Sequence, residues 1–162
     1  MGNKAKKTKS IKWCFSLKDG LKLSEPNTLL SASYMEQAKL SLLRSAKDIE
    51  DSDLLWGTVA AYYAEYYALC SFMQKIGVIG ENHFCVILLA SILLGEEKIN
   101  KISEHKEKRI GAQYFMKIDQ EINVRLMLAE AKAFVEELDK IMLNISEKDI
   151  TDYRLLIYRF LR

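Results

Sequence analysis

A permanent cation, an amide and a phenol lie close together in the sequence RIGAQY, which begins at Arg109. The guanidinium of Arg109 is charged at every physiological pH, and its fork of donors suits a phosphate group. In a helix, His105 and Gln113 lie four residues before and after Arg109 and share its face. Tyr114 lies about 140° away around an ideal helix, so it meets Arg109 only if the helix distorts near Gly111 or a second subunit closes the gap.

A solvated charged face is the alternative interpretation of residues 104–109, whose sequence EHKEKR mixes acids and bases. Runs of this kind are most often exposed and form local ion pairs. The two interpretations place the guanidinium of Arg109 differently, either toward a shared cleft or toward bulk water.

An isolated carboxylate, Glu65, is the only charged side chain between Asp53 and Lys75. A buried carboxylate is strongly destabilising unless a cation or hydrogen bonds compensate it. We therefore expect one of two arrangements. Either Glu65 pairs with a cation, for which Arg109 is the best candidate within one chain or across a dimer, or it lies on a thin solvent-exposed strip beside Thr58.

Two further residues are candidates for binding. His83 follows Glu81-Asn82 at the start of a predicted helix, where a histidine most often caps or packs. Tyr66 belongs to a group of four tyrosines that are able to stack on bases, although their helical spacing in an apolar stretch is more typical of a core. The chain has two histidines and no HExxH, P-loop or GxGxxG motif, so neither a metal site nor a cofactor is predicted.

Length and composition predict one globular domain. The 162 residues are 49% hydrophobic and 28% charged. Residues 1–25 hold seven lysines against Asp19 and Glu25, a charge of +5, which leaves −3 for the rest of a chain whose total is +2. We expect a basic tail and arm over residues 1–30 and a single helical domain over residues 31–162, the tail being more typical of a solubilising segment than of a phosphate-binding one.

Long helices are favoured because the chain has one proline and seven glycines. Residues 1–10 are lysine-rich and are expected to be disordered, and residues 11–23 to form an extended arm or a weak helix. Ser33 and Glu36 have the spacing of a capping box. With no strand pattern, the predicted fold is an all-α antiparallel bundle of five to six helices, over residues 34–49, 53–76, 83–94, 98–117, 120–143 and 147–161.

The predicted helix over residues 53–76 is apolar nearly all round, which indicates a central position. We expect Asp51 or Ser52 to cap its start and Gly77 to end it. One of its stripes consists of small residues that let another backbone approach closely, and we take it as support for a dimer: Gly57, Ala61, Ala64, Ala68 and Ser71.

The cysteines form no metal-ligand spacing, and Cys70 and Cys85 lie in apolar stretches where we expect them to be buried and unpaired. A reducing, cytoplasmic location fits this usage best. Leu54 to Met73 has a single charge, but its tyrosines and small polar residues make it too polar for a usual membrane span. We therefore expect no membrane association.

The order of these features resembles the HEPN family (higher eukaryotes and prokaryotes nucleotide-binding) from Tyr34 to about Asn144. The features that carry the resemblance are a first helix with Leu42-Leu43, the run Ala61-Tyr62-Tyr63-Ala64, an Asn82-His83 helix entry, and Arg109 followed by Gln113-Tyr114. Trp13-Cys14 before the domain is similar to an archaeal branch of that family.

The resemblance implies a helical bundle that forms a homodimer, with the arginine motifs of two subunits near each other. It also implies partnership with a minimal nucleotidyltransferase in a toxin–antitoxin pair, and contact with RNA or nucleotide. Catalytic members are metal-independent endoribonucleases with a histidine after the arginine. Here the arginine is Arg109, and Tyr114 stands in the histidine position.

Three functions follow from these residues. The first is a weakly catalytic or non-catalytic binding module, because a tyrosine with a pKa of about 10 is a poor base at neutral pH. The second is an endoribonuclease that uses Arg109 with Tyr114 or His105. The third is a structural helical adaptor, in which Arg109 forms only an interface ion pair.

Overall fold

The computed structural model describes the backbone of residues 2–162 and the side chains from Lys9 onward. This part of the chain is mostly helical, with one small two-stranded sheet, so the all-α class is confirmed. The elements are α1 (Gly2–Ser16), β1 (Leu21–Leu23), α2 (Thr28–Glu50), α3 (Leu54–Lys75), β2 (Val78–Gly80), α4 (His83–Leu94), α5 (Glu96–Phe115), α6 (Glu121–Asn144) and α7 (Glu147–Leu161).

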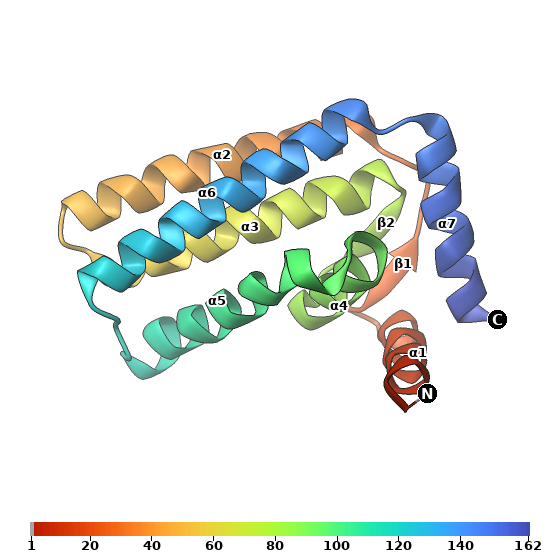
Figure 1. The fold of residues 1–162 in the computed structure, drawn as a ribbon, viewed down its shortest axis with the longest axis horizontal. Helices are drawn as coiled ribbons and strands as arrows, with labels where there is room; N and C mark the ends of the chain where they lie inside the picture. The colour runs from red at the N-terminus through yellow and green to blue at the C-terminus, as the bar shows by residue number, and fades with distance from the viewer. Residues whose placement is uncertain (1) are drawn as a thin grey trace.

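Helix α3 is the centre of the fold, as its apolar sequence predicts. It lies alongside α2 and α6 and packs against α5, while α1 and α7 lie together at one end (Figure 1). Tyr62, Leu69 and Phe72 of α3 are fully buried. Nothing in the described chain is long and apolar enough to form a membrane-crossing helix.

The small-residue stripe of α3 packs against α2 of the same chain. Ser45 Oγ donates to the carbonyl of Gly57 at 2.8 Å, and the hydroxyls of Ser31 and Ser71 each donate to the other's carbonyl. A Cβ at Gly57 would lie 2.8 Å from Ile49 Cγ1, so only glycine fits this approach without a shift. The stripe is therefore covered internally and gives no support to a dimer.

Two predicted helix starts are wrong. Helix α2 begins at Thr28, where Asn27 Oδ1 accepts from the backbone N–H of Leu30 at 2.9 Å, six residues before the predicted capping box. Ser33 lies inside the helix, and its hydroxyl donates back to the Leu29 carbonyl. Helix α3 is capped by Asp53 rather than by Asp51 or Ser52. The predicted bounds of α4 and α7 are confirmed.

The antiparallel pair β1–β2 was not predicted, because strands of three residues are too short to show a pattern. Leu21 pairs with Gly80 and Leu23 with Val78. Arg154 of α7 holds the end of this sheet, since its Nη1 lies within hydrogen-bond distance of the carbonyls of Ser24, Ile76 and Gly77. The carbonyls of Ser24 and Ile76 thereby gain a donor, and the Gly77 carbonyl also accepts from the backbone N–H of Ser24.

The N-terminal segment also differs from prediction. Helix α1 covers residues predicted to be disordered, and Ile11 and Cys14 on it are fully buried. Cys14 forms a disulfide with Cys85 in the first turn of α4, so the prediction that Cys85 is unpaired is wrong. Nothing in the local sequence links two cysteines 71 residues apart. Cys70 is free and buried, as predicted.

Reducing the Cys14–Cys85 bond is expected to lower the free energy of unfolding. The bond closes a loop with a sequence separation of 71 residues, which in the chain-entropy estimate corresponds to about 4 kcal/mol. Urea unfolding followed by circular dichroism, with and without reductant, measures the difference. Cys14→Ser should abolish the response to reductant and Cys70→Ser should keep it; a wild-type protein indifferent to reductant would contradict the linkage.

Candidate functional site on helix α5

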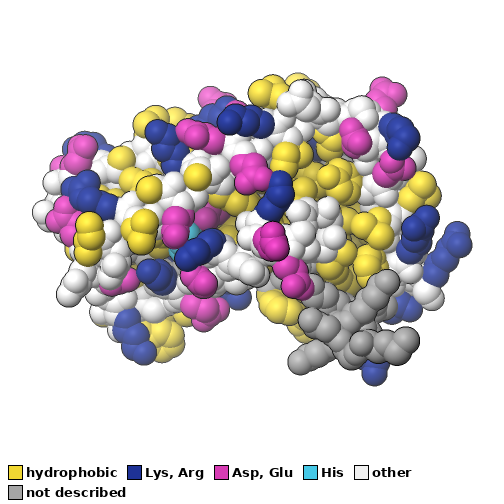
Figure 2. All heavy atoms as spheres, in the orientation of Figure 1, with side chains coloured by type: hydrophobic (Ala, Val, Ile, Leu, Met, Phe, Trp, Pro, Cys, Tyr) yellow, Lys and Arg dark blue, Asp and Glu magenta, His cyan; other side chains and the backbone are white. Residues whose placement is uncertain are grey.

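Helix α5 turns its polar pair, His105 and Arg109, toward the core. Their exposed fractions are 2% and 7%, and they share this face with the buried Ile102 and Ala112. The predicted shared face is confirmed. The solvated alternative is wrong for these two residues, although the neighbouring Glu104 and Lys108 are exposed. Figure 2 shows acidic and basic side chains interspersed over the α5–α6 half of one face of the molecule.

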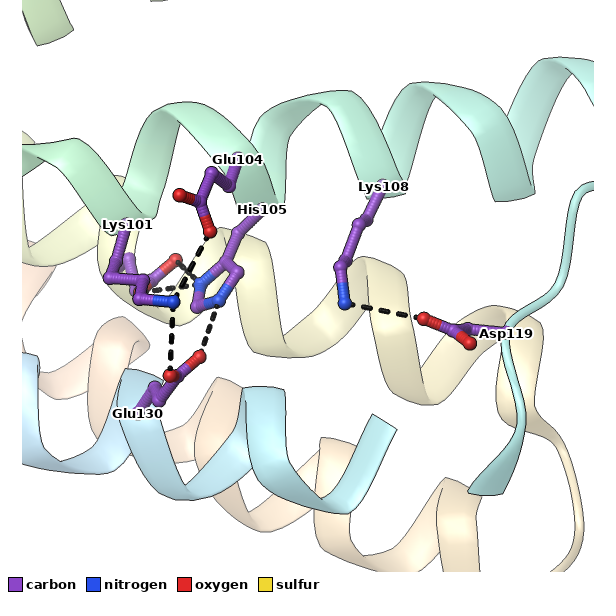
Figure 3. Close-up of polar contacts among 7 residues, drawn as sticks. Lys101, Glu104, His105, Lys108, Asp119 and Glu130 are labelled. Atoms are coloured by element: carbon purple, nitrogen blue, oxygen red, sulfur yellow. Dashed lines mark hydrogen bonds and ion pairs between the residues drawn. The ribbon is translucent and has the colours of Figure 1, made fainter. Parts of the chain in front are cut away.

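His105 links three helices by hydrogen bonds to two carboxylates. Its Nδ1 lies 2.9 Å from Glu65 Oε1 of α3, and its Nε2 lies 3.0 Å from Glu130 Oε2 of α6 (Figure 3). Lys101 lies 3.4 Å from the other oxygen of Glu130 and 3.2 Å from Glu104. Lys108 and Asp119 form a second bridge toward the loop before α6 at 3.2 Å.

The charge state of this cluster follows from its geometry. Burial alone would lower the pKa of His105, but the hydrogen bonds and charges of Glu65 and Glu130 outweigh it and raise that pKa above the ordinary value. Only an imidazolium donates from both nitrogens, and each nitrogen here faces a carboxylate oxygen. His105 is therefore the buried cation that stabilises the carboxylate of Glu65, which is 1% exposed.

The expected pair between Glu65 and Arg109 is wrong, and so is the solvent-exposed strip. Glu65 pairs with His105 because the two lie on the α6 side of the α3–α5 contact. Arg109 lies one helical turn further along α5, where it meets the aromatic side chains of α3. The predicted helix places His105 on the same face as Arg109. Helical spacing alone does not show which of these two residues pairs with Glu65.

Arg109 lies in an aromatic environment. Its Cζ is 5.1 Å from the ring centroid of Tyr62, 5.8 Å from that of Tyr63 and 6.0 Å from that of Tyr114. Its Nη1 donates to Gln113 Oε1 at 3.2 Å, as their spacing predicts. No carboxylate of the described residues pairs with it, and its buried Nε has no hydrogen-bond partner among them. The guanidinium keeps unused donor capacity.

His83 and Tyr66 lie together beside this guanidinium. Their rings stack with centroids 3.8 Å apart and planes 6° from parallel. His83 Nδ1 lies 2.7 Å from the hydroxyl of Tyr62. Burial lowers the pKa of His83 to about 4, helped by the charges of Arg109 and Lys106, so the ring is neutral at pH 7. Packing and a local hydrogen bond therefore account for both residues.

The proton positions in this group follow from the donors. Burial raises the pKa of Tyr62 well above its ordinary value, while the charge of Arg109 and a hydrogen bond from it act in the opposite direction. The phenol of Tyr62 carries its proton, so it donates to His83 Nδ1 across the 2.7 Å contact. The proton of the neutral ring then lies on Nε2. His83 thus accepts at Nδ1 and carries a donor at Nε2, so it has no free lone pair to act as a base.

Tyr114 differs from the other tyrosines because it lies at the exposed end of α5, with 65% of its surface accessible. Helix α5 ends one residue later, and Met116 adopts a left-handed conformation with φ of 52°. Tyr114 reaches Arg109 within one chain without the predicted kink at Gly111 or a second subunit, through an aromatic contact rather than a hydrogen bond. It is followed by the exposed Phe115 and Met116.

The site therefore combines a cation with unused donors, a neutral imidazole donor and several aromatic rings. It lacks a free base: both nitrogens of His105 face carboxylates, and Nδ1 of His83 faces a phenol. Within the described residues, no group of three or more histidine, cysteine, aspartate and glutamate side chains could hold a metal ion. Such an arrangement suits binding of an anion better than acid–base chemistry.

Two residues of the site were not predicted. Glu130 stands among several acids of an amphipathic helix, and no local signal distinguishes it from its exposed neighbours. Tyr62 was predicted only as one of several core tyrosines, and its hydroxyl becomes important only because His83 and Arg109 converge on it.

Comparison with known proteins gives no match. No protein-family model matches this chain, and neither the curated proteins nor the solved structures include a significant relative.

Replacing His105 by leucine is expected to lower the free energy of unfolding by about 3–5 kcal/mol, because it leaves Glu65 buried without a cation. Lys101→Leu is the matched control on the exposed side of the cluster and should change stability little. The double variant Glu65→Leu, His105→Leu should recover most of the loss. Urea unfolding checks all three; equal effects of the two single variants would contradict the arrangement.

The two histidines are expected to titrate on opposite sides of their ordinary pKa. His83 should stay neutral down to a pH of about 4, and His105 should stay charged above its ordinary pKa. The stabilisation due to His83 is therefore complete above a pH of about 6.5 and lost as the pH falls toward 4. That due to His105 is complete below a pH of about 6.5 and lost as the pH rises through its folded-state pKa.

Imidazole proton shifts in an NMR titration measure both pKa values, since the chain has only two histidines. Glu65→Gln should lower the pKa of His105 and leave that of His83 unchanged. Two histidines titrating together near their ordinary pKa would contradict both assignments.

Proposed function

We propose that this protein is a HEPN-like module that binds RNA or nucleotide through Arg109 and cleaves RNA weakly or not at all. The observation that carries the proposal is the guanidinium of Arg109, which is held among aromatic rings and has no carboxylate partner among the described residues. A phosphate is the natural acceptor for such a group, because the planar guanidinium presents a fork of donors to two of its oxygens.

The environment of Arg109 supports binding of a nucleotide rather than a simple ion pair. Arg109 contacts the half-buried Tyr63 and Gln113 and the exposed Tyr114. Aromatic rings beside an arginine are the combination that single-stranded nucleic acids meet on proteins, where bases stack and phosphates are neutralised. Lys106 adds a second positive charge near the site, since it contributes with Arg109 to the lowered pKa of His83.

Weak or absent catalysis is proposed because the site has no available base. Attack by a ribose 2′-hydroxyl on the adjacent phosphate needs a group that accepts a proton near neutral pH. Tyr114 is a phenol, and His105 has both nitrogens occupied. The alternative function, a metal-independent endoribonuclease using Arg109 with Tyr114 or His105, would require one of these groups to be released. A structural adaptor is the third candidate, but an interface ion pair would need a carboxylate from a partner.

The assembly and location complete the proposal. On the resemblance to HEPN proteins, we propose a homodimer and a nucleotidyltransferase partner in a toxin–antitoxin pair, with no membrane association. We also propose a cytoplasmic location. The location rests on the same resemblance, because the Cys14–Cys85 disulfide removes the argument from unpaired cysteines.

Arg109→Ala is expected to weaken binding of a fluorescently labelled single-stranded RNA by about tenfold or more, the effect of losing charged hydrogen bonds to phosphate. Arg109→Lys should also weaken binding, because an ammonium cannot form the forked contact. Arg125→Ala is the matched control, since Arg125 is exposed and paired with Glu121. Fluorescence anisotropy measures the affinities, and a thermal melt verifies that each variant folds.

The same samples test the other candidate functions. Equal RNA affinity of wild type and Arg109→Ala would leave only the structural adaptor. Cleavage of the RNA by wild type that Arg109→Ala abolishes would favour the endoribonuclease and contradict the non-catalytic part of the proposal. A sedimentation experiment at micromolar concentration tests the homodimer, which a purely monomeric protein would contradict.

A further inference from the structure

A groove between α2 and α3 is lined by aromatic and polar side chains, and apart from Tyr63 none of them is among the described contacts of Arg109. Its volume is about 410 Å³. The floor consists of the buried Val59 and Ala60 of α3, whose small side chains leave space above the helix. The walls are formed by Trp56, Tyr63 and Tyr67 on one side and by Gln37, Ser41, Arg44 and Asp48 on the other.

The aromatic wall is a stripe along one face of α3. Trp56, Tyr63 and Tyr67 are spaced seven and four residues apart, so they point in nearly the same direction. Trp56 is 52% exposed, and its indole has no aromatic partner among the described residues. The rings of Tyr63 and Tyr67 are half-buried with centroids 5.6 Å apart. An exposed indole beside two tyrosines is a surface on which a planar ring can stack.

The polar wall carries charges of both signs that do not neutralise each other by direct contact. Arg44 is exposed and makes no ion pair within 4 Å among the described residues. It acts on Asp48 only through longer-range charge, and Asp53 lies nearby with its carboxylate capping the start of α3. Unpaired donors and acceptors beside an aromatic surface match the edge of a nucleobase, which presents both.

The groove adjoins the Arg109 site through one shared residue. The Tyr63 ring lines the groove, and its centroid is 5.8 Å from Cζ of Arg109. A single nucleotide therefore has a place for each of its parts. The phosphate meets the guanidinium, and the base lies on the far side of Tyr63, against Trp56. This arrangement rests on the proposed function of Arg109, which concerns the phosphate, and it adds a place for the base.

We propose that the α2–α3 groove binds an unstacked nucleobase of a nucleotide or of single-stranded RNA whose phosphate engages Arg109. Trp56 and Tyr67 supply the stacking surface. Asp48 accepts hydrogen bonds from an exocyclic amino group, and Arg44 donates to the ring nitrogens or carbonyl of the base. The groove therefore prefers adenine, cytosine and guanine, which carry an amino group, over uracil, which does not.

The chain offers a direct reporter of this binding. It has two tryptophans, so Trp13→Phe leaves Trp56 as the only indole. Trp13 lies on α1 and contacts Phe84, away from the groove. Titration of the Trp13→Phe protein with adenosine 5′-monophosphate should quench the fluorescence of Trp56 in a saturable manner. Uridine 5′-monophosphate should require a concentration several-fold higher, and Asp48→Asn should reduce that difference.

Variants of the stacking residue test the role of the ring. Calorimetric titration with adenosine 5′-monophosphate should show an affinity about tenfold or more weaker in Trp56→Leu, since stacking of one base contributes about 1–3 kcal/mol. Trp56→Phe should retain most of the affinity because it keeps an aromatic face. Both changes are at a half-exposed position, and circular dichroism verifies that the variants fold.

The outcomes separate the groove from the Arg109 site. If Arg109→Ala weakens nucleotide binding while Trp56→Leu and the Trp56 signal do not respond, the groove is not a base site and the proposed function stands. If adenosine binds as tightly as its 5′-monophosphate and Trp56→Leu abolishes both, the groove is supported and the phosphate site fails. If Trp56→Leu changes only the sedimentation of the protein, the groove is a contact between subunits and the inference is wrong.

Discussion

The contact of His105 with two carboxylates determines how α5 lies in this fold. The imidazolium that faces Glu65 and Glu130 joins α5 to both α3 and α6, and Ile99 and Ile102 of α5 pack in the core beside it. An ion buried to this degree is tolerated only when all its donors are satisfied, which fixes the rotation of α5 about its axis. Arg109, one turn later, is thereby brought against the aromatic face of α3.

That rotation explains why two cations on one helix face have different roles. His105 is saturated by carboxylates and acts within the framework, whereas Arg109 meets phenol rings and one amide and keeps donors unused. Aromatic faces attract a guanidinium but do not use up its N–H groups. A carboxylate in the position of Tyr62 would pair with Arg109 and occupy its donors. Because α3 has a tyrosine there, Arg109 remains available for binding, whereas His105 has a structural role.

The sequence predicts the parts of this arrangement that depend on local periodicity. The central position of α3, the bounds of α4 and α7, and the common face of His105, Gln113 and Arg109 all follow from helical spacing. The pairings that join distant segments do not. Glu130 resembles its exposed neighbours, the β1–β2 strands are too short for a pattern, and Cys14 finds Cys85 only when α1 packs on α4. Long-range contacts are set by packing, which spacing along one helix does not encode.

The contacts of Arg154 with the carbonyls of Ser24, Ile76 and Gly77 affect the order in which the chain folds. The Arg154 guanidinium reaches the carbonyl of Ser24, which lies 130 residues earlier in the sequence. During synthesis the carbonyls of Ser24 and Ile76 therefore stay hydrated until Arg154 has left the ribosome and α7 has packed against this corner. A contact that spans so much of the sequence closes late in folding, after the helices between its two ends have formed.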